Sequence, residues 1–175
     1  MSLKVPERVW WKPLGWQEKV WVTVSLVWCL VLFLMMPLWM AVGKQNNPTE
    51  TYRVSPARFL ETASALIEKY KVGEEKGIPI IRPPRGSDVY LVARMWQWNP
   101  ILELKKGETY RLHVSSLDLQ HGLSIQPLNM NFQVLPGYDY VLTLTPTQAG
   151  EYSVICNEYC LIGHHNMTGK IIVRE

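Results

Sequence analysis

A long apolar segment lies near the start of the chain. The 24 residues from Val20 to Gly43 include no charged side chain. As an α-helix they would span about 36 Å at ~1.5 Å per residue, and the hydrocarbon core of a bilayer is about 30 Å thick. A cleaved signal peptide has a shorter apolar stretch of roughly 7–15 residues before a small-residue cleavage site. The pattern therefore predicts a single retained transmembrane helix over residues 20–43.

Residues 44–87 have the composition of a linker, with one helical pattern inside it. Ser55 followed by Pro56 is typical of an N-cap and the first position of a helix. Apolar residues then recur at helical spacing until Gly73, which is expected to end the helix. The sequence therefore predicts a short helix at about 56–72, flanked by polar and by Pro- and Gly-rich segments.

From Asp88 onward the pattern changes to short segments rich in Val, Ile, Leu, Tyr and Thr. The predicted strands are VYLVARMW, ETYRLHVSS, MNFQVL, YDYVLTLTP, GEYSVIC and TGKIIVR. Gly, Pro, Asn and Asp separate them. Several strands at this spacing predict a compact all-β sandwich or barrel over residues 88–175.

Tryptophan and charge extend the membrane interpretation. Six of the eight Trp lie in the first forty residues, around the apolar segment, as in the aromatic belts of membrane interfaces. Residues 1–19 carry four Lys/Arg against two Glu. This excess predicts a cytoplasmic N-terminus, with everything after residue 43 on the periplasmic or outer side of the cell membrane.

The β-rich part of the chain is weakly acidic. Residues 88–175 contain six Lys/Arg and eight Asp/Glu. A nucleic-acid partner is not expected, because phosphate binding requires a basic face.

Four soft or borderline metal donors lie within twelve residues near the C-terminus. They are Cys156, Cys160, His164 and Met167, in the spacing C-x3-C-x3-H-x2-M. The segment leaves one predicted strand and enters the next, so the donors are expected on a loop at one end of the sandwich. Thiolate, imidazole and thioether together favour copper because of their softness.

Three other interpretations account for only part of this motif. Zinc binds Cys and His, but a thioether is not among its usual ligands. A single blue-copper ion uses one Cys, two His and a weak axial Met, which leaves the second Cys unused. A disulfide between Cys156 and Cys160, which an oxidising compartment would allow, closes only a short loop and leaves His164 and Met167 unexplained. Two thiolates can instead bridge two copper ions, each with one terminal His.

A two-copper site requires a second imidazole from outside this loop. His113 lies within an alternating strand, where a solvent-facing or packed histidine is ordinary. His121 lies at a turn between strands and is followed by Gly122, so it is the predicted ligand. His165, adjacent to His164, is expected to be an exposed loop residue.

With His121 included, the chain resembles a known family. The motif C-x-E-x-C-x3-H-x2-M and the upstream D-x-x-H-G are similar to the binuclear CuA motif of subunit II of heme–copper oxidases. The resemblance covers the whole chain in order and implies a cupredoxin-like Greek-key domain after the anchor. One transmembrane helix, where mitochondrial-like enzymes have two, is most like the B-type (ba-type) prokaryotic oxidases.

The resemblance also implies a complete ligand set. The implied ligands are Cys156 and Cys160 as bridging thiolates, His121 and His164 as terminal imidazoles, Met167 as a weak ligand of one copper and the Glu158 carbonyl as a weak ligand of the other. In mitochondrial-like relatives the side chain at the position of Glu158 also holds magnesium, whereas B-type relatives commonly have Gln there. Magnesium binding by this chain therefore stays open.

The implied function is electron transfer in a respiratory oxidase. The chain would accept electrons from cytochrome c and pass them to heme in the catalytic subunit I, where heme and CuB reduce oxygen to water. The family places an aromatic cluster over the copper site, where cytochrome c docks. By this resemblance Trp96 and Trp98 are the expected electron-entry residues, with Trp96 favoured, although alternating Trp could equally pack one face of the sandwich. The weak acidic excess predicts docking that depends only modestly on salt.

Two other functions share this motif. A CuA-type nitric oxide reductase uses a similar subunit with a different catalytic partner, and a stand-alone membrane-tethered copper carrier would need no heme partner. Asp118, three residues before His121, either helps to orient the turn that carries this histidine or is a simple turn-forming residue.

Overall fold

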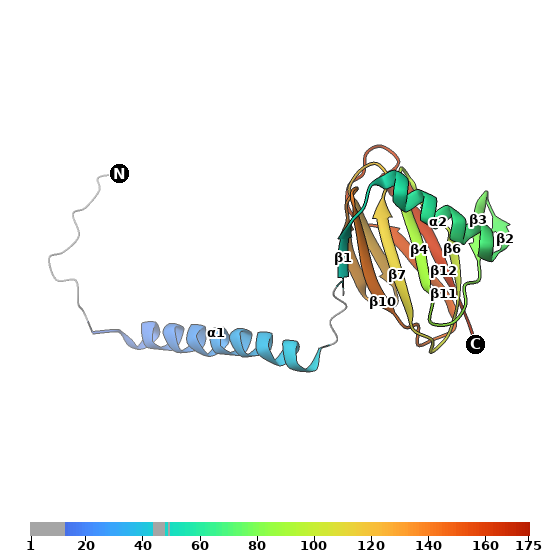
Figure 1. Ribbon diagram of the computed structural model, residues 1–175. Helices are drawn as coiled ribbons and strands as arrows, with labels where there is room; N and C mark the ends of the chain where they lie inside the picture. Colours follow the sequence, from blue (N-terminus) through green and yellow to red (C-terminus); the bar gives the residue numbers. More distant parts are fainter. Residues whose placement is uncertain (1–12, 44–47, 49) are drawn as a thin grey trace, which may run out of the picture. The chain divides into compact units, whose positions relative to one another are not determined.

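The structure, a computed structural model, describes residues 13–43, 48 and 50–175. The chain divides into two compact units, Met1–Gln45 and Asn46–Glu175, and each is described separately below. Figure 1 shows a helix in the first unit and a β-sandwich with one short helix in the second.

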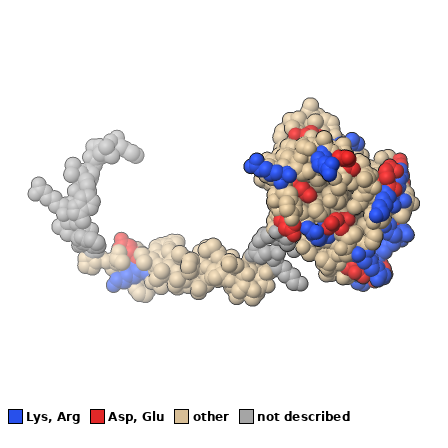
Figure 2. All heavy atoms as spheres, viewed as in Figure 1, with Lys and Arg blue, Asp and Glu red and all other residues tan. Residues whose placement is uncertain are grey.

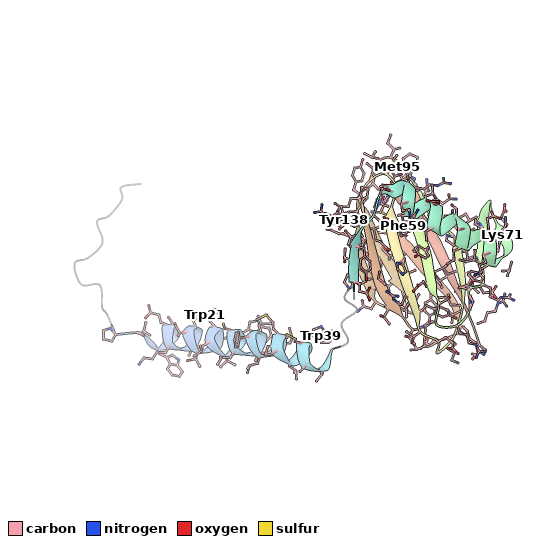
Figure 3. All side chains as sticks on the ribbon, in the orientation of Figure 1. Trp21, Trp39, Phe59, Lys71, Met95 and Tyr138 are labelled. Carbon is pink, nitrogen blue, oxygen red and sulfur yellow. The ribbon has the colours of Figure 1, made fainter. Side chains whose placement is uncertain are left out.

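The first unit contains helix α1, Trp16–Val42, of 27 residues. At ~1.5 Å per residue it is about 40 Å long, and it is long and apolar enough to cross a membrane. The side chains of Trp21 and Trp39 project from it (Figure 3), and none of its residues is buried within the chain. The basic residues among positions 1–12, on which the predicted orientation partly rests, lie outside the described residues.

The second unit is built on two mixed sheets. One sheet has the strand order β1 (Glu50–Arg53), β10 (Tyr138–Leu144), β7 (Tyr110–Ser116), β4 (Asp88–Arg94), β5 (Gln97–Asn99). The other has the order β2 (Lys71–Glu75), β3 (Ile78–Ile81), β6 (Ile101–Lys105), β12 (Thr168–Arg174), β11 (Gly150–Cys156), β8 (His121–Gln126), β9 (Met130–Val134). The neighbours β4 and β7 run parallel, as do β3 and β6 and also β6 and β12. This architecture confirms the predicted all-β sandwich that follows one apolar helix.

The core lies between the two sheets. Leu91, Leu112 and Leu142 from the first sheet and Val154 and Ile171 from the second are all at most 1% exposed. Because side chains alternate along a strand, the polar residues between them face outward. Burial of an aliphatic side chain of this size contributes roughly 1.5–3 kcal/mol, so these residues hold the two sheets together.

Helix α2, Pro56–Tyr70, covers part of the sandwich (Figure 1). The Ser55 hydroxyl accepts a hydrogen bond from the Arg58 N–H at 3.3 Å, as an N-cap does. Phe59 and Ala63 are buried on one face, four residues apart, and the Phe59 ring packs against Tyr90 of β4 at 5.4 Å. The N-cap signal therefore located the start of this helix.

Residues 71–81 form the hairpin β2–β3 at the edge of the second sheet, where the sequence predicts the last two residues of the helix and part of the second linker. Its two-residue turn, Lys76-Gly77, has positive φ at both positions, as a type I′ turn requires. Ile81 at its end is fully buried. Gly77 lies in the turn and Gly73 and Pro79 lie in the strands of this hairpin, whereas Pro83, Pro84 and Gly86 follow it.

Four further strands were absent from the sequence prediction, namely β1, β5, β6 and β8. Strand β6 has four buried residues in succession, so the alternation of a half-buried strand is missing. Strand β5 has only three residues. Strand β8 begins at His121, which the sequence analysis placed in a turn.

Candidate metal centre

Two paired strands hold the C-terminal motif at both ends. We call residues 157–167, between β11 and β12, the ligand loop. The strands pair up to Ile155 and Thr168, directly below the loop, and Cys156 is the last residue of β11. Strand β8 lies on the other side of β11, with Leu123 opposite Cys156. The short distance along β8 from Leu123 back to His121 therefore brings this histidine to the same end of the sandwich.

The two motif cysteines lie close together as free thiols. Their Sγ atoms are 3.7 Å apart, far longer than the ~2.05 Å of a disulfide. A metal–sulfur bond is about 2.3 Å long, so both sulfurs can reach the same ion. The Nδ1 atom of His121 is 3.9 Å from Cys156 Sγ, and that of His164 is 3.6 Å from Cys160 Sγ. Each thiol thus has its own imidazole.

Two weaker donors complete the group in the same pairwise manner. The backbone carbonyl oxygen of Glu158 is 3.3 Å from Cys156 Sγ. The thioether sulfur of Met167 is 3.8 Å from Cys160 Sγ. One side of the thiol pair therefore has an imidazole and a carbonyl, and the other has an imidazole and a thioether.

Four of the donor residues are shielded from water, and His164 and Glu158 are half-buried. His121 and Met167 are fully buried, and Cys156 and Cys160 are at most 4% exposed. Burial, together with the hydrogen bond and charge of Cys156, raises the pKa of the Cys160 thiol to about 11. Two thiolates this close would repel one another without a cation, whereas a bound cation favours the deprotonated ligands. The donor set consists of soft ligands that are mostly buried from solvent, which fits copper.

Asp118 fixes the orientation of His121. Its Oδ1 lies 2.8 Å from His121 Nε2, so the imidazole donates through Nε2 and leaves Nδ1 free to bind a metal. Its other oxygen accepts from the Met95 N–H at 2.7 Å. Burial alone raises the pKa of Asp118, but hydrogen bonds from Met95, His121 and Leu119 outweigh it, and the net pKa is lowered. Asp118 orients the histidine as well as forming the turn.

Three glycines allow the segments around the donors to approach closely. A Cβ on Gly122 would lie 2.1 Å from the Asn157 side chain and 2.8 Å from the Glu158 backbone. A Cβ on Gly163 would overlap the Trp96 ring, and one on Gly169 would lie 2.9 Å from Trp98. Gly163 precedes His164 in the ligand loop and Gly169 lies within β12, and neither position predicts this close approach from the sequence.

The two tryptophans of the β4–β5 turn have different environments. Trp96 is 39% exposed, and its indole N–H donates to the Cys160 carbonyl at 2.8 Å. Trp98 is 1% exposed and meets the His121 ring edge-on at 6.4 Å. Trp98 therefore packs in the core and cannot contact a docked protein, which corrects its assignment to the docking surface. Trp96 joins the surface to the ligand loop through this hydrogen bond.

Exposed apolar side chains surround Trp96. We call this group the apolar rim: Met95, Trp96, Tyr159, Leu161 and Ile162, of which Ile162 is 86% and Tyr159 76% exposed. The rim lies at the end of the domain where Met95 is labelled in Figure 3. Figure 2 shows few charged atoms at this end in the view drawn. Exposed apolar groups of this kind mark interaction sites.

The remaining histidines lie apart from the donor group. His113 is buried, with its Nδ1 2.7 Å from Asp139 and its ring stacked on Tyr90 at 4.6 Å. His165 is exposed on the ligand loop. The choice of His121 over His113 agrees with this geometry.

The fold and the donor set define a copper-binding β-sandwich attached to an apolar helix. No family model matches the chain. Cytochrome c oxidase subunit 2 of Thermus thermophilus is 32% identical over 162 residues, which cover 90% of this chain and 92% of the relative. The chain belongs to the cytochrome c oxidase subunit 2 family.

Other relatives and solved structures agree. A probable cytochrome c oxidase subunit 2 of Streptomyces coelicolor is 34% identical over 74 residues, 42% of this chain and 23% of that protein. A chain of a heme–copper terminal oxidase dimer superposes with a TM-score of 0.55 at 25% identity, covering 90% of this chain and 99% of that one. A rusticyanin variant, with a TM-score of 0.51 at 19% identity over 72% of this chain and 99% of its own, shares the fold alone. The sandwich is thus cupredoxin-like, and the family together with α1 indicates a membrane-anchored subunit of a terminal oxidase complex.

Proposed function

We propose that this chain accepts electrons from a cytochrome c at a binuclear copper centre and passes them to heme in the catalytic subunit I, where heme and CuB reduce oxygen to water. The observation that carries the proposal is the paired donor geometry. Two free thiols lie 3.7 Å apart, and each has an imidazole and one weaker donor beside it. A single blue-copper site would leave one of these sulfurs without a role.

Each residue of the group has a defined part. Cys156, Cys160, His121, His164, Met167 and the Glu158 carbonyl would together hold two copper ions, with the two cysteines as thiolates and the two histidines as neutral imidazoles. Copper bound in this way supplies one-electron transfer with the electron shared between two ions. The paired strands below the ligand loop restrict movement of the donors, so little reorganisation accompanies the change of charge.

The path of electrons into the centre is proposed to run through Trp96. Its ring is exposed within the apolar rim, and its N–H contacts the carbonyl of Cys160, a proposed ligand. A docked cytochrome c would cover this ring and exclude water from it. The few charges at this end (Figure 2) support docking that is largely apolar.

The subtype and the orientation belong to the same proposal. The single helix in the described residues that could span a membrane, and the Thermus thermophilus relative, support a B-type oxidase. The N-terminus would be cytoplasmic and the copper domain periplasmic or outer. The Glu158 carboxylate accepts a hydrogen bond from Gln133 at 3.4 Å, so a magnesium ion there would take its remaining ligands from the partner subunit.

Copper analysis and EPR of the full chain in detergent test the proposal. We expect two copper ions per chain and hyperfine structure from one electron shared by both nuclei. Cys160→Ser should abolish that signal, whereas the matched control Cys29→Ser, in α1 of the other compact unit, should leave it unchanged. One copper or one zinc per chain would refute the binuclear centre.

The alternative functions are not favoured by the comparisons, because the relatives are subunits of cytochrome c oxidases. Gas consumption by the purified complex separates them further. Oxygen uptake with reduced cytochrome c supports the oxidase, whereas consumption of nitric oxide alone, or isolation of the chain without a heme-containing partner, would contradict it.

A further inference from the structure

An open cavity of about 640 Å³ lies in the sandwich away from the metal donors. Its lining includes Tyr70, Arg82, Pro83, Glu103, Leu104 and Arg174. Strand β12 starts beside Met167 and ends at Arg174, and its seven residues rise by about 20 Å. The cavity is therefore at the opposite end of this strand from the ligand loop and takes no part in holding copper.

The cavity is built around a buried carboxylate. Glu103 of β6 is 4% exposed. Arg82 donates to it through Nε at 2.6 Å, and Arg174 through Nε at 2.5 Å and Nη2 at 3.1 Å. These hydrogen bonds lower the pKa of Glu103, with Arg174 the largest cause. The carboxylate thus holds two guanidinium groups in fixed positions at the wall of the cavity.

Both arginines keep unused donors. Among the described residues, neither Nη atom of Arg82 donates a hydrogen bond to another side chain or to the backbone. The side chains of Arg82 and Arg174 are 58% and 62% exposed. A guanidinium that is already oriented loses less entropy when it binds an anion, and it matches phosphate and carboxylate oxygens in pairs.

The remaining lining has two kinds of surface. Four Lys/Arg side chains face the cavity against two carboxylates, an excess of two positive charges that matches a phosphate monoester near neutral pH. Tyr70, Pro83 and Leu104 add an apolar wall. Figure 2 shows Lys and Arg gathered along the side of the domain where β2, β3 and the C-terminus lie in Figure 1.

We propose that this cavity binds a small phosphate monoester, with the phosphate against Arg82 and Arg174 and an apolar or aromatic group against Tyr70 and Pro83. The same chemistry is present in a soluble metabolite and in the headgroup of phosphatidate. The site is separate from the copper centre and does not depend on it.

Calorimetric titration of the full chain in nonionic detergent tests the proposal, with phenyl phosphate and inorganic phosphate as probes. Phenyl phosphate should bind more tightly than inorganic phosphate, because only the ester contacts the apolar wall. Arg82→Gln should weaken binding at least about tenfold, since hydrogen bonds to charged groups are lost. Arg82→Lys, which keeps the charge but not the planar fork, should weaken it less.

The matched control is Arg58→Gln. Arg58 lies on α2, is 72% exposed and pairs with Glu61, so its loss changes the net charge equally without touching the cavity. Equal weakening by Arg58→Gln and Arg82→Gln would show unspecific attraction and overturn the proposal. Absence of phenyl phosphate binding by the unaltered chain would also overturn it, and thermal unfolding shows whether each variant is folded.

Competition then identifies the source of the ligand. Displacement of phenyl phosphate by phosphatidate vesicles, with none by neutral vesicles or glycerol phosphate, supports a lipid headgroup. Displacement by glycerol phosphate at similar phosphate concentration supports a soluble monoester. Failure of both monoesters to compete would overturn the proposal.

Discussion

Asp118 and His121 illustrate how one carboxylate determines what a ligand can do. The Asp118 carboxylate accepts from His121 Nε2 at 2.8 Å and from the Met95 N–H at 2.7 Å. The first contact selects the imidazole tautomer with a free Nδ1. The second ties the β7–β8 turn to the turn that carries Trp96. A single side chain therefore positions both a proposed ligand and the proposed point at which electrons arrive.

We predict that Asp118→Asn lowers copper affinity about 10–100-fold, the usual effect of losing a hydrogen-bond partner of a metal-binding histidine. The amide can present its NH₂ to Nε2 and favour the wrong tautomer. Competition with a copper chelator measures the affinity. Asp139→Asn, at the His113 pair outside the centre, is the matched control and should leave copper affinity unchanged. Equal losses in both variants would mean that Asp118 has no specific role.

Gly122 gives a second prediction at this scale. A Cβ at this position would lie 2.1 Å from Asn157 Oδ1 and 2.8 Å from the Glu158 N atom, so Gly122→Ala must displace the ligand loop. We expect a lower copper content or a distorted EPR spectrum, with a loss of stability of roughly 1–3 kcal/mol from overpacking. Gly73→Ala, where the nearest atom would be 3.9 Å away, serves as the control. An unchanged spectrum in Gly122→Ala would contradict this view of the loop.

At the scale of elements, Glu103 joins three segments that are distant in the sequence. It lies on β6 and pairs with Arg82, which follows β3, and with Arg174 at the end of β12. These hydrogen bonds hold the pKa of Glu103 below its ordinary value. A carboxyl whose folded pKa is lowered stabilises the fold above its unfolded pKa of about 4.3, and this contribution is lost as pH falls through the folded pKa.

We therefore predict that Glu103→Gln lowers the free energy of unfolding by about 1–2 kcal/mol at neutral pH. The difference from the unaltered chain should shrink as the pH falls below about 4, because the native carboxyl is then also protonated. Thermal or denaturant unfolding across this pH range measures it. Glu61→Gln, at an exposed pair, should change stability by less than about 1 kcal/mol. A constant difference at all pH values would exclude ionisation as the cause.

Elements also differ in how well the sequence predicted them. The apolar segment, the Ser55-Pro56 N-cap and the strands around the ligand motif were predictable because each has a strong local pattern. The hairpin β2–β3 was missed because its Gly and Pro residues resemble those of a linker. Strand β6 was missed because burial on both faces removes the alternation on which strand prediction depends.

The candidate site was likewise predictable only where its residues lie close together in the sequence. The spacing from Cys156 to Met167 indicated soft-metal chemistry without any structure, because those donors are adjacent in the sequence. The second imidazole could only be chosen between His113 and His121 from their surroundings. Trp96 lies at the surface and Trp98 in the core, and the sequence does not predict this difference. It depends on the packing of Trp96 against Gly163 and of Trp98 against Gly169, which are contacts between segments distant in the sequence.

At the scale of the whole molecule, the domain has two functional ends. The apolar rim and the ligand loop lie at one, and the cavity with its arginines lies at the far end of β12. The rim has large apolar side chains that are up to 86% exposed. An apolar contact with a partner gains little from long-range attraction and loses little when salt is added.

We predict that Trp96→Leu lowers kcat/KM for reduced cytochrome c about tenfold or more, because exposed Trp residues at the centre of an interface contribute strongly to binding. Copper content and the EPR signal should persist. The control Tyr52→Leu, an aromatic 50% exposed on β1 outside the rim, should have no effect on kcat/KM. Turnover should fall only modestly from low to physiological ionic strength, and a steep fall would contradict apolar docking.

The origin of the donors has a consequence for how the oxidase is assembled. Every atom of the proposed ligand set belongs to this one chain, and all of them gather at one end of a unit with its own core. With the proposed ligand set, metal insertion would not require the catalytic subunit to be present. A subunit of this design can be loaded before it meets its partner, so the cell can complete, inspect or discard the copper domain as a separate step of biogenesis.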